Sequence, residues 1–222
     1  MCIFGTDVGE NFMDSIITAL ATLAAAYFGA LFAFKFQERK EERKILTNNI
    51  AAGNRAMFLL FRQFNELSVI QKQIIEPART HPAKFVVMRP ALPLNYESLR
   101  FEVNNLSFLL ETKHRQVLMD LLIEEGRFHA AVQALNKRSK VHLHDVQPVL
   151  EKAGIVEGGD YSLSQLRDAM GNRLFTQLNR ATDQMINHID DSIKSLLQMG
   201  DKLYEVLKEL YPGETFIRFK PI

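Results

Sequence analysis

The chain has 222 residues, of which 47% are hydrophobic and 24% are charged, with 27 Lys and Arg against 26 Asp and Glu. The apolar fraction is ample for a packed core, and sixteen Phe with balanced charge are unlike a disordered chain. A net charge of +1 gives no concentrated basic surface, so no nucleic-acid partner is expected. The single cysteine, Cys2, excludes an internal disulfide and a cysteine-based zinc finger.

The first distinctive segment is residues 15–34, SIITALATLAAAYFGALFAF, which has no charged residue and no proline. Twenty helical residues span about 30 Å, the thickness of the hydrocarbon core of a bilayer. A cleaved signal peptide would have basic residues before its apolar stretch, whereas only Asp7, Glu10 and Asp14 are charged here. The sequence therefore predicts a transmembrane helix over 15–34, preceded by a short extracytosolic N-terminus over 1–14.

The charges around this segment predict its orientation. No Lys or Arg precedes it, and no other segment is long and apolar enough to cross a bilayer. Five basic residues follow it directly, namely Lys35, Arg39, Lys40, Arg43 and Lys44. Because basic residues collect on the cytosolic side, we expect a single-pass protein of the cell membrane with its N-terminus outside and the rest in the cytosol.

The predicted transmembrane helix has two unlike faces. At 100° per residue, bulky apolar side chains fall on one side and small ones on the other. The small face consists of Thr18, Ala21, Thr22, Ala25, Ala26, Gly29, Ala30 and Ala33. Small residues let helices approach closely in lipid, so this face is predicted to contact a second copy of the chain or another membrane protein.

The remainder is predicted to be all-α, with a helical bundle over 35–211 and a tail over 212–222. Apolar residues at helical spacing indicate three long helical regions, near 35–76, 96–140 and 162–211. Pro77 to Pro93 separate the first two regions, with a short extended piece expected at 85–88. Ser162 and Gln165 have capping-box spacing, and Pro212 with Gly213 ends the last helix.

An antiparallel bundle of these regions would return the end of the second helix toward the membrane. That end carries Lys137, Arg138 and Lys140, which would join the five basic residues after the transmembrane helix. Together they are predicted to form a collar against anionic headgroups, at about 1 kcal/mol per well-placed residue. The alternative is a solvated helix end whose cations interact with the helix dipole.

A search for catalytic or metal-binding patterns finds only incomplete ones. Glu111 with His114, and Glu125 with His129, are acid–histidine pairs at helical spacing. A di-metal site in a bundle needs a second Glu-x-x-His motif and further glutamates, which the sequence lacks. We expect neither metal nor cofactor, and no phosphate-binding or nucleophile motif indicates an enzyme.

Two functions from different classes fit this organisation. The first is a membrane-anchored interaction protein (a scaffold, adaptor or signalling accessory) that self-associates or binds a partner protein. The second is an oligomeric membrane-perturbing effector or channel, for which Thr18 and Thr22 are candidates for a polar lining. The small face of the transmembrane helix and the bundle favour the first.

Overall fold

The computed structural model of the chain describes residues 7–93, 96–156 and 159–218, with side chains described from Ser15 onward. Its regular elements are all helical, with no strand among the described residues, so the all-α prediction is confirmed. The chain divides into two compact units, residues 1–48 and residues 49–222. Residues 1–6 of the predicted N-terminal segment and 219–222 of the predicted tail lie outside the described residues.

Unit 1 consists of a single helical element in its described part. Helix α1 spans Asp7–Ile70, and its residues up to Asn48 belong to this unit. Helix α1 continues without a break through 15–34, because this stretch contains no proline and a single glycine, Gly29. Residues 15–48 are all exposed except Leu31, which is partly covered.

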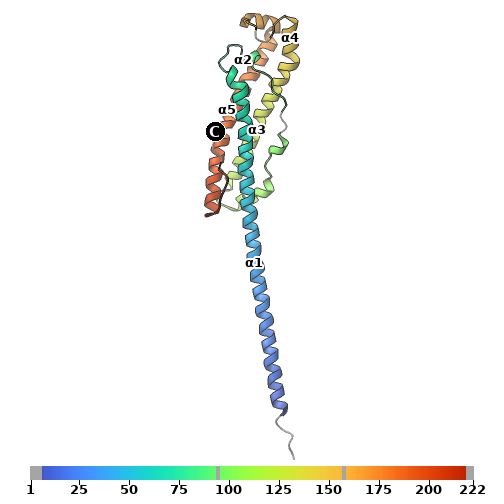
Figure 1. The fold of residues 1–222 in the computed structure, drawn as a ribbon, viewed down its shortest axis with the longest axis vertical. Helices are drawn as coiled ribbons and strands as arrows, with labels where there is room; N and C mark the ends of the chain where they lie inside the picture. The colour runs from blue at the N-terminus through green and yellow to red at the C-terminus, as the bar shows by residue number, and fades with distance from the viewer. Residues whose placement is uncertain (1–6, 94–95, 157–158, 219–222) are drawn as a thin grey trace, which may run out of the picture. The chain divides into compact units, whose positions relative to one another are not determined.

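Among its described residues, unit 2 contains the rest of α1 and nine further helical elements, of which the α-helices are labelled in Figure 1. The short ones are η1 Gln71–Ile75, η2 Glu76–Ala78, α2 Lys84–Val87, η3 Glu97–Leu99, η4 Val103–Glu111, η5 His142–Val146 and α4 Gln147–Lys152. The long ones are α3 Gln116–Val141 and α5 Leu163–Leu210. Helix α5 begins at the predicted capping box, in which Ser162 and Gln165 cap each other reciprocally.

Helix α5 runs antiparallel to both other long helices of unit 2. Near its C-terminal end a Cβ on Gly53 of α1 would meet Leu207 at 2.8 Å, and further back Gln71 donates to Asp190 at 2.8 Å. Along α3, Lys202 pairs with Asp120 at 2.6 Å, and Ser192 donates to the Arg127 carbonyl at 3.3 Å. The part of α1 that belongs to unit 2, residues 49–70, therefore runs parallel to α3.

Residues 88–93 and 96–115 belong to the return between these two parallel helices, and their regular parts are the short helices η3 and η4. The prediction of one long helix over 96–140 is therefore wrong for its first twenty residues, and the extended piece expected at 85–88 is the helical turn α2. Pro90 and Pro93 prevent an α-helix at the start of the return. Further along, the Phe101 amide donates to the Glu125 carboxylate at 2.6 Å instead of to a helical carbonyl.

The core of unit 2 consists of two apolar clusters separated by polar side chains. The larger cluster uses α5 from Met185 to Leu207, and the smaller one uses α5 from Leu166 to Leu178. The buried residues between them are Thr182 on α5 and Arg138 with Ser139 on α3. A polar layer thus crosses the core between the two clusters.

Arg138 is the central residue of this layer, and it is fully buried. Its guanidinium donates to the Phe85 carbonyl at 2.9 Å, to the Arg89 carbonyl at 3.1 Å and to the Met88 carbonyl. Burial lowers the pKa of Arg138 to about 10, so the group remains charged at neutral pH. These bonds hold residues 85–89 against α3.

Replacing Arg138 tests the importance of the polar layer. Arg138→Met keeps the apolar stem but leaves the carbonyls of Phe85, Met88 and Arg89 without this donor, so the free energy of unfolding should fall by about 3 kcal/mol or more. Thermal and urea unfolding of the full-length protein in detergent would measure this loss. Lys140→Met, at an exposed position of the same helix, is the matched control and should change stability little. Equal melting temperatures for the two variants would contradict this role.

Candidate functional site

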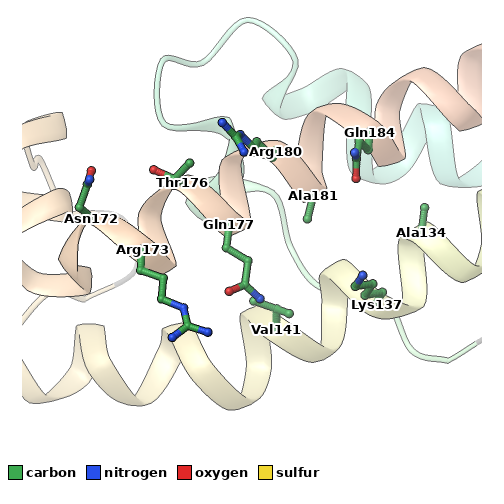
Figure 2. A pocket seen from close by; sticks show the side chains of 10 residues that line it. All are labelled: Ala134, Lys137, Val141, Asn172, Arg173, Thr176, Gln177, Arg180, Ala181 and Gln184. Carbon is green, nitrogen blue, oxygen red and sulfur yellow. The ribbon is translucent and has the colours of Figure 1, made fainter.

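A cavity lies between the C-terminal half of α3 and the N-terminal half of α5 (Figure 2). This α3–α5 groove has a volume of about 640 Å³. Its lining consists of Ala134, Lys137 and Val141 from α3 and Asn172, Arg173, Thr176, Gln177, Arg180, Ala181 and Gln184 from α5. Figure 2 shows Arg173 and Gln177 extending from α5 toward α3.

Both helices are irregular where the groove ends. Gly171 interrupts α5 with φ 71° and ψ 153°, a conformation that L side chains rarely adopt, and the lining begins at the next residue. On the other side, α3 passes directly after Val141 into the π-helical turn η5. Such turns within helices occur often at functional sites. The groove is therefore bounded by two departures from α-helical geometry.

The electrostatic character of the groove is positive. Its lining contains three cations, Lys137, Arg173 and Arg180, and no acidic side chain among the described residues. All three cations are exposed. The nearby acid Asp183 is engaged elsewhere, since it pairs with Lys84 at 2.9 Å. Chemically, the groove can attract anionic groups and donate hydrogen bonds to them.

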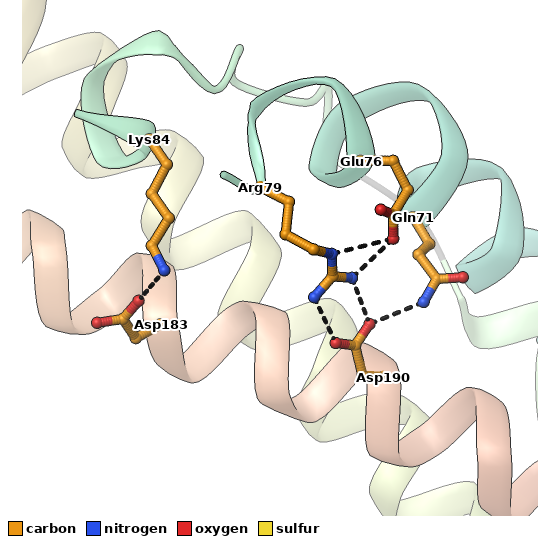
Figure 3. A network of polar contacts seen from close by, with 6 residues as sticks. All are labelled: Gln71, Glu76, Arg79, Lys84, Asp183 and Asp190. Carbon is orange, nitrogen blue, oxygen red and sulfur yellow. Dashed lines mark hydrogen bonds and ion pairs between the residues drawn. The ribbon is translucent and has the colours of Figure 1, made fainter. Parts of the chain in front are cut away.

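A second polar cluster joins the end of α1 to α5 (Figure 3). Arg79 pairs with Asp190 at 2.8 Å and with Glu76 at 2.8 Å, and Gln71 also donates to Asp190. Burial opposes ionisation of Asp190, but the hydrogen bonds from Arg79 and Gln71 outweigh it and hold the pKa of this carboxyl below its usual range. Every member has a partner inside unit 2, so the cluster is a structural connection.

The predicted helix-interface residues lie in unit 1 and are all exposed there. Helix α1 is continuous through them, which places Ala25 and Gly29 one turn apart on one face. A Cβ added at Gly29 would meet no atom within 4 Å. The Thr22 hydroxyl donates to the Thr18 carbonyl at 2.8 Å, so this polar group is satisfied within its own helix. The described residues leave this face uncovered.

The predicted membrane collar requires a correction. Arg138 cannot contact headgroups, because it is fully buried and bonded to backbone carbonyls. The expected return of the second helix is also wrong. Within unit 2, the Ile217 amide donates a hydrogen bond to the Asn54 side chain near the C-terminal end of α5. Arg138 instead lies beside Thr182, in the N-terminal half of α5. Lys137 and Lys140 are exposed at that far end, and Lys137 lines the groove.

The acid–histidine pairs have other roles than metal binding. Glu111 and His114 precede α3 instead of lying on it, and His114 pairs with Glu209 of α5 at 3.2 Å. Glu125 holds the Phe101 amide, and the His129 ring lies 4.6 Å from that of Tyr96. No three metal-ligating side chains gather among the described residues.

No protein-family model matches the chain, and comparisons with curated proteins and with solved structures find no significant similarity. Function is therefore argued from the residues of this chain. Sequence reasoning missed the groove, because its two walls are separated by thirty residues of chain. The signal available was Arg173 and Arg180, seven positions apart and so on the same face of one helix.

The lowered pKa of Asp190 predicts a dependence of stability on pH. The folded state binds the proton of this carboxyl more weakly than the unfolded state does, so the contribution is present at neutral pH and is lost as pH falls below about 5. Asp190→Asn should therefore be less stable than wild type at pH 7, and the difference should shrink on acidification. Thermal melting of full-length protein across this range measures it.

Asp191→Asn, at an exposed neighbouring aspartate, is the control and should follow the wild-type curve. If Asp190→Asn and wild type lose stability in parallel as the pH falls, the network does not depend on the ionised carboxylate.

Proposed function

We propose that this protein is a membrane-anchored interaction protein, in which residues 15–34 cross the cell membrane once and unit 2 is a cytosolic helical bundle that binds partner proteins. The observation that carries the proposal is the exposure of the anchor segment. One helix among the described residues is long and apolar enough to cross a membrane, and none of its apolar window is buried.

The exposed side chains of this segment favour a lipid environment. They include Ile16, Ile17, Leu20, Leu23, Tyr27, Phe28, Phe32 and Phe34. Each large apolar side chain gains about 1.5–3 kcal/mol on leaving water, so the segment needs a cover, and the described part of the chain supplies none. A core helix of a soluble protein would be buried within the fold. The satisfied Thr22 hydroxyl also suits hydrocarbon, where unpaired polar groups are costly.

The basic residues after the anchor support the proposed topology. Lys35, Arg39, Lys40, Arg43 and Lys44 are exposed on the continuation of α1. In the proposed orientation they lie on the cytosolic side, where each contributes about 1 kcal/mol of attraction to anionic headgroups. These five residues make up the collar without the residues of α3. The short N-terminal segment is then extracytosolic.

The interaction role is favoured over a channel by the composition of the anchor. Its small face lacks charged residues, and the Thr22 hydroxyl is already bonded to the Thr18 carbonyl. A water-filled pore needs a polar lining, whereas close packing of helices needs only the small side chains that this face has. We therefore propose that the small face contacts a second copy of the chain.

Topology is the first test of this function. A reporter active only on the outer face of the membrane, fused after Ile222, should give no signal, because the basic residues retain the C-terminal part in the cytosol. The same reporter fused before Met1 should be active. Activity of the C-terminal fusion would contradict the orientation, and release of the protein by alkaline extraction of membranes would contradict the anchor.

Self-association is tested at Gly29. Gly29→Leu adds bulk at the centre of the small face, at a position where an added Cβ would meet no atom within 4 Å, so it should mainly disturb a contact between chains. Cross-linking of the full-length protein in membranes should fall sharply. Leu20→Ala, on the opposite face, is the control and should cross-link as wild type does. Equal cross-linking in wild type and Gly29→Leu would exclude this interface, and dye leakage that Gly29→Leu abolishes would favour the channel.

A further inference from the structure

We propose that the α3–α5 groove binds an acidic peptide segment of a partner protein, with Arg173, Arg180 and Lys137 pairing with its carboxylates. The inference deepens the proposed interaction role and rests on it, because it names the chemistry of the partner. It depends only on residues of unit 2.

The three cations of the groove form a local concentration of positive charge, and the described lining residues include no acid that could pair with them. The chain as a whole has a net charge of +1, so a lining with three cations and no acid, among the residues described, is not a property of the whole surface. Lys140 is also exposed, three positions after Lys137 on α3. Two neighbouring acids of α5 are held by other cations, Asp183 by Lys84 and Asp190 by Arg79. An anionic partner would therefore meet attraction without a competing carboxylate in the lining.

The spacing of the cations favours a ligand with several separate anionic groups. Arg173 and Arg180 are seven residues apart on α5, so their Cα atoms are separated by about 10 Å along the helix. Carboxylates two and four residues apart on an extended peptide lie on one side of it, about 7 and 14 Å apart, which brackets this separation. Lys137 lines the groove from the facing helix.

The exposure of the groove and the polar side chains in its lining also fit a peptide. Sites for small molecules enclose most of their ligand, whereas the cations of this groove are exposed. Beside the cations, the lining includes Thr176, Gln177 and Gln184, which can both donate and accept hydrogen bonds. A peptide backbone presents alternating amides and carbonyls to such side chains. A segment lying along the groove would leave its outer side in solvent.

The position of the groove within unit 2 argues against lipid headgroups as its ligand. The residues that begin this unit pack near the C-terminal end of α5, where Gly53 approaches Leu207. The groove lies at the other end of α5, beginning directly after Gly171. Residues 180 to 207 of this helix separate the two places by about 40 Å. We therefore commit to an acidic segment of a protein.

The test uses full-length protein in nanodiscs of zwitterionic lipid and a fluorescent peptide of alternating Glu and Ala. Fluorescence anisotropy at low salt should show saturable binding that weakens as salt is raised, as exposed charge pairs do. Arg180→Glu and Arg173→Glu should each weaken the affinity by about tenfold or more, since each converts an attraction into a repulsion. The matched control is Lys194→Glu, which makes the same charge change at an exposed position of α5 outside the groove and should bind as wild type does.

Four outcomes would overturn the proposal. The first is an absence of peptide binding to wild type. The second is an equal loss of affinity in Lys194→Glu and Arg180→Glu, which would indicate general attraction by unit 2. The third is complete displacement of the peptide by pyrophosphate at lower concentration than by unlabelled peptide, which would indicate a small-anion site. The fourth is binding to nanodiscs of anionic lipid that Arg180→Glu abolishes, which would identify headgroups instead. Because membrane extraction tests the anchor separately, a failed anchor with intact peptide binding would reject only the membrane part of the proposed function.

Discussion

The guanidinium of Arg138 is the interaction on which the architecture of unit 2 depends. A buried cation without a carboxylate partner is tolerated only if its donors are satisfied, and here the fork of Arg138 meets the carbonyls of Phe85, Met88 and Arg89. Arginine suits this position better than lysine, because its planar head has five donors in fixed directions. The same contacts fix the chain at the C-terminal end of α2, where the return toward α3 begins. Removing the cation would therefore release the end of the bundle as well as one side chain.

The polar layer also explains why the groove is where it is. Arg138 and Thr182 point into the core, and their chain neighbours Lys137 and Ala181 line the groove outside. The packing that satisfies the buried guanidinium thus sets the separation of α3 and α5 at the level where Lys137 and Arg180 line the groove. Gly171 and the π turn after Val141 then allow both helices to change course just beyond it. The buried polar layer and the α3–α5 groove therefore use neighbouring residues of the same two helices, α3 and α5.

Elements that depend on local sequence were predictable, and those that depend on distant contacts were not. The capping box at Ser162 and the stop at Gly213 follow from neighbouring residues, and the structure has both. The return between α2 and α3 was not predicted, because it depends on contacts between residues distant in sequence. One of them is the hydrogen bond from the Phe101 amide to the Glu125 carboxylate, twenty-four residues away. Arg138 was assigned to the surface because it stands among cations. Its spacing from Ala131 and Leu135 places it on the buried face of α3, and this signal was present in the sequence.

The two units present opposite requirements to their surroundings. Unit 2 buries its own apolar side chains in two clusters, and what it leaves outside at the groove is positive charge. Unit 1 buries almost nothing, and what it leaves outside over residues 15–34 is apolar. Water suits the first surface but not the second, and a single partner cannot satisfy both, because an apolar environment would strip the cations of their hydration. The chain is therefore suited to two different environments at once, and this division favours a bilayer for the one and an acidic protein segment for the other.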